Sequence, residues 1–190
     1  MTYFISKLSA ICVKKDLIDS EDVPWLEYGI ETRITTAITM VPFMLLAVRL
    51  SDLPTALAFL VAFKFLRTRT SGYHANSVLG CISVSLILEF LFLGVFLQQL
   101  NLVIFYISNG VSLTLIFLLA PFIHPNMNLS EEEILALRYS ARRRVMLTIL
   151  LVLACNFLNF AAVAKGLTTG TAMAAFMLCL AYFFEWRKST

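Results

Sequence analysis

A histidine and a cysteine stand seven residues apart in one short polar stretch of an otherwise apolar chain. The stretch runs from Arg67 to Cys81 and contains Arg69, Gly72 and His74. A thiolate beside an imidazole is the activated nucleophile of cysteine peptidases. In one continuous helix His74 and Cys81 would share a face but lie about 10.5 Å apart, because each residue adds roughly 1.5 Å of rise. A reaction that uses both therefore requires the chain to bend between them.

The sequence between the two residues provides for such a bend. Gly72 frees the backbone just before His74, and Asn76 and Ser77 are residue types that cap helix N-termini. Cys81 would then lie in the first turn of the following helix or just beyond it, where the helix dipole favours a thiolate. The nearby arginines favour the thiolate further. The pair predicts a catalytic base and nucleophile; the alternative is an ordinary surface histidine and an ordinary packed cysteine.

The composition of the rest of the chain indicates which kind of structure positions His74 and Cys81. Of the 190 residues, 59% are hydrophobic and only 14% are charged, and the mean hydropathy is +0.84. A soluble domain normally carries about 25% charged residues. The long apolar runs need lipid as their solvent, and a spanning helix takes roughly 20 residues, so the chain has room for about six.

The hydropathy pattern predicts an all-α, polytopic membrane protein that forms one membrane-embedded domain over residues 1–190. Residues 1–31 have the pattern of an amphipathic segment that lies on the membrane surface, and Val23-Pro24-Trp25-Leu26 interrupts its helical run. This segment carries too many charges for a cleaved signal peptide. Six transmembrane helices are predicted at about residues 34–50, 53–66, 77–98, 101–123, 145–164 and 167–186.

The positive charges predict the orientation of these helices. If both termini are cytoplasmic, the outside holds only Arg49 and Lys165 of the 15 Lys and Arg residues, which is a strong positive-inside bias. The same orientation puts His74 and Cys81 on the cytoplasmic side. The net charge of +3 is thus explained by topology, and no basic–aromatic stripe indicates nucleic-acid binding.

Several other polar residues have predicted roles. Ser130 and Glu133 form a capping-box pattern, which predicts a short surface helix that is acidic at its start and basic at its end. Glu89 lies inside the third predicted span, and ionisable residues in membranes are expensive and often functional. Gly166 and Gly170 form a G-x-x-x-G pattern, which indicates a close helix contact, a dimer interface or an interfacial turn.

Polar side chains in the last two predicted spans could join helices by hydrogen bonds, namely Asn156, Asn159 and Thr168–Thr171. The cysteines other than Cys81 show no metal-ligand spacing. Cys155 and Cys179 lie in apolar runs, where cysteine usually behaves as a small hydrophobe. We therefore expect no metal and no cofactor.

Three sequence landmarks resemble the AgrB (accessory gene regulator B) family of bacterial membrane endopeptidases. The first is the stretch from Arg67 through Gly72-Tyr73-His74-Ala75-Asn76-Ser77 to Cys81, which resembles the family's active-site region. The second is Tyr28-Gly29-Ile30-Glu31 before the first predicted span. The third is Pro121 with His124-Pro125-Asn126 after the fourth. The resemblance extends over nearly the whole chain and includes its size and the order of its predicted spans.

The resemblance implies a specific reaction. AgrB-like enzymes, which reside in the bacterial cell membrane, cut the precursor peptide AgrD near its C-terminus. Cys81 would form a thioester with the N-terminal part of the precursor, and His74 would be the general base. An internal Cys or Ser of the peptide would then close a thiolactone or lactone ring, the precursor of a quorum-sensing signal. Arg67 and Gly72 match positions linked to activity, Glu31 is a weaker candidate for orienting His74, and a homodimer is implied.

Two other classes of function remain open from the residues alone. A membrane peptide transporter or exporter would use broken helices and charges at the membrane midplane, for which only Glu89 qualifies. A non-catalytic interaction protein would leave Cys81 unreactive. A rhomboid-type serine protease is disfavoured because no Gly-x-Ser-x-Gly turn is present.

Overall fold

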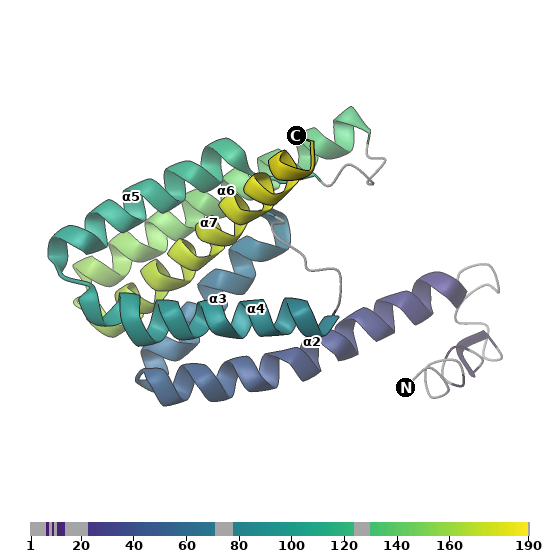
Figure 1. The fold of residues 1–190 in the computed structure, drawn as a ribbon, viewed down its shortest axis with the longest axis horizontal. Helices are drawn as coiled ribbons and strands as arrows, with labels where there is room; N and C mark the ends of the chain where they lie inside the picture. Colours follow the sequence, from purple (N-terminus) through teal and green to yellow (C-terminus); the bar gives the residue numbers. More distant parts are fainter. Residues whose placement is uncertain are drawn as a thin grey trace. The chain divides into compact units, whose positions relative to one another are not determined.

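The computed structural model describes residues 7, 9, 11–13, 23–70, 78–123 and 130–189, and its regular elements in these ranges are all helical (Figure 1). This confirms the predicted all-α class. The helices are α2 (Val23–Leu50), α3 (Leu53–Thr70), α4 (Val78–Phe90), α5 (Leu102–Leu119), α6 (Glu131–Phe157) and α7 (Ala161–Ser189). A π-helical segment, η2 (Leu91–Phe96), and a 3-10 turn, η3 (Leu97–Gln99), continue directly from α4. The chain forms two compact units, residues 1–42 and 43–190, so that α2 belongs to both.

The first unit differs from the predicted surface segment 1–31. Its described residues between 7 and 13 are helical, and the Ser9 hydroxyl donates a hydrogen bond to Glu27 Oε1 at 2.6 Å. However, α2 begins at Val23 and includes residues 23–31, so Pro24 starts a helix that continues into the first predicted span. Proline is tolerated there because the first-turn N–H groups have no partner within the helix.

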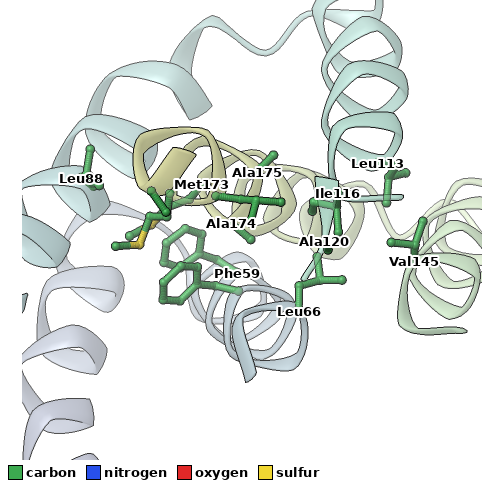
Figure 2. Packing of buried hydrophobic residues seen from close by; sticks show 14 of the residues in the cluster. Phe59, Leu66, Leu88, Leu113, Ile116, Ala120, Val145, Met173, Ala174 and Ala175 are labelled. Atoms are coloured by element: carbon green, nitrogen blue, oxygen red, sulfur yellow. The ribbon is translucent and has the colours of Figure 1, made fainter. Parts of the chain in front are cut away.

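The second unit is organised around α3 and α7. Figure 2 shows Phe59 of α3 beside Met173 and Ala174 of α7, and Leu66 of α3 near Ala120 at the end of α5, all of them buried. The same hydrophobic cluster continues into Leu113 and Ile116 of α5, Val145 of α6 and Leu88 of α4. The two central helices therefore hold the others in place.

Glycines on α7 make the contact with α3 possible. A Cβ at Gly166 would lie 2.3 Å from the carbonyl oxygen of Thr55, and a Cβ at Gly170 would lie 2.4 Å from that of Phe59. Only a residue without a side chain allows the two backbones to approach so closely. The predicted close helix contact is confirmed as one within the chain, and the alternative of an interfacial turn is wrong because both glycines lie inside α7.

The turn between the last two helices lies earlier than predicted. α6 ends at Phe157, and Asn159 adopts a positive φ of 59°. The Phe160 N–H donates to the Cys155 carbonyl at 2.8 Å, which caps the end of α6. Asparagine tolerates this left-handed conformation better than most residues. The predicted spans 145–164 and 167–186 therefore have wrong boundaries, because Asn159 and not Gly166 forms the turn.

The predicted capping box is confirmed, but the helix that it starts is not short. The Glu133 N–H donates to Ser130 Oγ at 3.3 Å, and the Ser130 N–H donates to Glu133 Oε2 at 2.9 Å. From this cap α6 continues for 27 residues without a break. The predicted surface helix and the beginning of the fifth predicted span are therefore one helix.

Three helices in the described part of the chain are long and apolar enough to cross a membrane. They are Ile82–Gln99, which covers most of α4 with η2 and η3, then Leu102–Leu119, which is α5, and Ala161–Phe184 of α7. Of the other long helices, α3 carries Lys64, Arg67 and Arg69, and α6 begins with three glutamates. The apolar stretch Met40–Leu50 of α2 is shorter than a span. Fewer helices than the six predicted thus meet the criterion, and the six-span arrangement stays a prediction.

Hydrogen bonds between helices involve fewer residues than predicted. Asn109 of α5 donates through Nδ2 to Thr168 Oγ1 of α7 at 2.7 Å. Thr169 and Thr171 instead donate to carbonyls of their own helix, and Asn156 Nδ2 has no partner within the described residues. Threonine bonds of this kind satisfy the hydroxyl within one turn, so they do not join helices.

Candidate functional site

The C-terminal end of α3 leads into the polar stretch that carries His74, and two other segments hold it. The Phe122 N–H, just after α5, donates to the Thr70 carbonyl at 3.0 Å. The Phe122 ring packs edge-on against Tyr182 of α7 at 5.0 Å, and the Tyr182 hydroxyl donates to the Leu119 carbonyl at 2.7 Å. Thr70 is fully buried. The segment at Pro121 therefore links the end of α3 to α5 and α7.

Arg144 of α6 holds the same end of α3 from another side. Its Nη1 donates to the Phe65 carbonyl and to Thr68 Oγ1, and its Cζ lies 4.7 Å above the centre of the Phe65 ring. Burial lowers the pKa of the Arg144 guanidinium, and the positive charges of Arg69 and Arg143 lower it further. A cation at a helix C-terminus interacts favourably with the exposed carbonyls. Arg144 thus caps α3 and joins it to α6.

Cys81 belongs to the first turn of α4. The helix begins at Val78, which makes Cys81 its fourth residue. Peptide N–H groups in a first turn have no partner within the helix, and they favour a negative charge nearby. The backbone position agrees with the prediction that Cys81 lies near a helix N-terminus.

The structure describes the other predicted site residues to different extents. His74 and Gly72 lie outside the described residues, and of Glu31 and Cys81 the backbone alone is described, within α2 and α4. Arg67 is half-buried in the last turn of α3. The predicted pairing of His74 with Cys81, and the supporting roles of Arg67, Gly72 and Glu31, therefore stay predictions.

Glu89 is fully buried in α4, two residues before the π-helical segment η2 begins. Neither of its carboxyl oxygens has a hydrogen-bond partner within the described residues. It lies eight residues after Cys81, which is about 12 Å along a helix. Glu89 is thus a buried acid at some distance from the candidate nucleophile, next to the kind of helix irregularity that often occurs at functional sites.

Sequence reasoning missed the contacts that Phe122 and Arg144 make with α3. The run Arg142–Arg144 predicted only topology, and Pro121 entered only as a family landmark. The signal that could have found Arg144 is its place in that run, at the border of an apolar helix, since arginine commonly binds helix C-terminal carbonyls. Nothing in the sequence pattern indicated which helix it would meet.

The all-helical described ranges, with three helices long and apolar enough to cross a membrane, are consistent with a helical membrane protein. The family model of AgrB, Accessory gene regulator B, matches residues 3–180, and the chain belongs to this family. Membership connects the chain with the accessory gene regulator system of quorum sensing and with peptidase-like processing proteins. Comparisons with curated proteins and with solved structures gave no match.

Proposed function

We propose that this protein is a membrane cysteine endopeptidase that cuts an AgrD-like precursor peptide and closes the product into a thiolactone or lactone. The observation that carries the proposal is the family match over residues 3–180, a range that includes both His74 and Cys81. The position of Cys81 in the first turn of α4 supports it, because a thiolate is favoured there.

In the proposed reaction His74 takes the proton of the Cys81 thiol, and the thiolate attacks a peptide carbonyl of the precursor. The C–N bond breaks, the leaving amine takes the proton from the imidazolium, and the N-terminal part stays on Cys81 as a thioester. A Cys or Ser side chain of the same peptide then gives its proton to His74 and attacks that thioester, which releases the Cys81 thiolate. Exchange of one thioester for another is nearly isoenergetic, so a thiolactone can form without ATP.

The surroundings of the site favour ring closure over hydrolysis. A site at the border of apolar helices restricts water, which would otherwise hydrolyse the acyl-enzyme. An amphipathic peptide would also be concentrated at the membrane surface. The proposed arrangement has six spans in one domain, with both termini and the site in the cytoplasm of a bacterial cell, and it includes the implied homodimer.

Co-expression with an AgrD-like precursor peptide tests the proposal. Mass spectrometry of wild-type cells should find the shortened peptide one water lighter than its linear form, as expected for a ring. Cys81→Ala should give no cut product, whereas Cys179→Ala, which changes a half-buried cysteine of α7, should process normally. Continued cutting by Cys81→Ala would refute the proposal. Export of an uncut peptide by that variant would indicate a transporter instead.

A further inference from the structure

Three arginine side chains from two helices gather where α3 meets α6. Arg69 lies in the last turn of α3, while Arg143 and Arg144 are neighbours on α6. The charges of Arg69 and Arg143 both act on Arg144, whose guanidinium is fixed by the Phe65 carbonyl. Arg69 and Arg143 are exposed. The fold therefore concentrates positive charge at one place.

No acidic side chain in the described ranges compensates this charge. None of the three arginines has a carboxylate partner there, and no carboxylate contributes to the electrostatics of Arg144. The closest acid of the first turn of α6, Glu133, precedes Arg143 by ten residues, which is about 15 Å along the helix. Exposed charges at that distance are screened, since the Debye length is about 8 Å at physiological salt. The arginine cluster thus lacks a counter-ion within this part of the chain.

Both helices continue from the arginines into exposed apolar side chains. On α6, Met146, Leu147 and Leu150 follow Arg143 by three, four and seven residues, so they share its face. Leu150 is 61% exposed. On α3, Val61 precedes Arg69 by eight residues, a little over two turns, and is 63% exposed. The surface therefore has a cationic end that continues along the helices into an apolar stripe.

We propose that this surface, formed by Arg69, Arg143 and Arg144, binds the phosphate group of an anionic phospholipid whose acyl chains lie along α6. The arginine fork matches phosphate oxygens in charge and in geometry. Basic sites between membrane helices recognise anionic headgroups in this way. A soluble acidic peptide would match the charge but would leave the apolar stripe uncovered, so the lipid fits both features. The proposal is independent of the proposed reaction.

Native mass spectrometry of the purified full chain, released from nanodiscs of phosphatidylcholine with a minor fraction of phosphatidylglycerol, tests this proposal. The wild type should retain phosphatidylglycerol well above its share in the nanodisc. Arg143→Gln should lower that preference by about fivefold, the contribution of one interfacial arginine. Arg143 suits the test because it is exposed and, unlike Arg144, caps no helix.

Arg138→Gln is the matched control, because Arg138 is exposed on the same helix but does not act on Arg144. It makes the same charge change and should leave the lipid preference as it is. Equal losses in the two variants would overturn the proposal, since net charge would then explain them. No loss in Arg143→Gln would overturn it as well. A soluble polyglutamate peptide is also tested with the protein in pure phosphatidylcholine nanodiscs. If the peptide binds, needs Arg143 and is displaced by salt alone, the arginine cluster binds a polypeptide and the lipid proposal is wrong.

Discussion

The close approach of α7 to α3 leads to a quantitative prediction for Gly166→Ala. The added Cβ would meet the Thr55 carbonyl oxygen at 2.3 Å and the Ala58 Cβ at 2.8 Å. The first distance is about 1 Å shorter than the roughly 3.5 Å of a normal van der Waals contact. A backbone oxygen cannot rotate away as a side chain can, so the two helices must separate.

The expected loss in the free energy of unfolding follows from the packing between α7 and α3 that this separation would weaken. Overpacking of this kind typically costs about 1–3 kcal/mol, and the rigid backbone at Thr55 argues for the upper end. Alanine recovers about 1 kcal/mol through its higher helix propensity. We therefore expect Gly166→Ala to lower the free energy of unfolding by about 2 kcal/mol.

Gly110→Ala supplies the matched control. Gly110 lies in α5, and a Cβ there would have nothing within 4 Å, so this variant should be as stable as the wild type or up to about 1 kcal/mol more stable. Reversible unfolding in mixed micelles with increasing SDS, followed by circular dichroism, measures both. Equal stabilities of the two variants would refute the described packing. So would a Gly166→Ala variant that loses only self-association, because the glycines would then line a dimer interface.

Two further predictions concern acidic residues. Hydrogen bonds from the backbone and side chain of Ser130 lower the pKa of Glu133 below its ordinary 4.5, so this cap stabilises α6 above that pH and is lost as the pH falls through the lowered pKa. Amide hydrogen exchange should therefore show that the first turn of α6 loses protection in acid. The Glu133→Gln variant should show no such loss. An equal loss in both proteins would contradict the capping role. Glu89 is buried without a partner in the described part of the chain, so we expect it to be the neutral acid. Glu89→Gln should therefore have the same free energy of unfolding as the wild type, whereas Glu89→Ala should lower it by about 2 kcal/mol through lost packing. A Gln variant as weak as the Ala variant would indicate a charged carboxylate with a partner.

Local signals in the sequence predicted the helices and several of their ends. The capping box at Ser130 and the break between the predicted spans 77–98 and 101–123 were predictable because each uses side chains adjacent in sequence. At this break Asn101 Oδ1 accepts the Ile104 N–H at 2.9 Å. The turn at Asn159 was not, because both glycine and asparagine can adopt the left-handed conformation. The packing against α3 shows that Gly166 is needed for the close contact between the two helices, whereas Asn159 forms the turn.

The sequence singles out candidate site residues but not the contacts that support them. Residue type and spacing point to His74 and Cys81, and their catalytic pairing stays a prediction. The supports of α3 depend on tertiary contacts between residues 52 and 79 positions apart, Thr70 with Phe122 and Phe65 with Arg144. No local pattern can encode which segments meet over such a separation.

These supports connect segments that lie far apart in the sequence. The segment at Pro121 holds the Thr70 carbonyl through Phe122, and Arg144 holds the carbonyl of Phe65 one turn earlier. Both contacts fix the end of α3, from which the chain continues to His74. Cys81 follows in the first turn of α4. A nucleophile and its base must be held within hydrogen-bond reach, and a misplacement of about 1 Å can cost a factor of 100 in rate. In the proposed reaction, the segment at Pro121 and Arg144 would act by holding the end of α3.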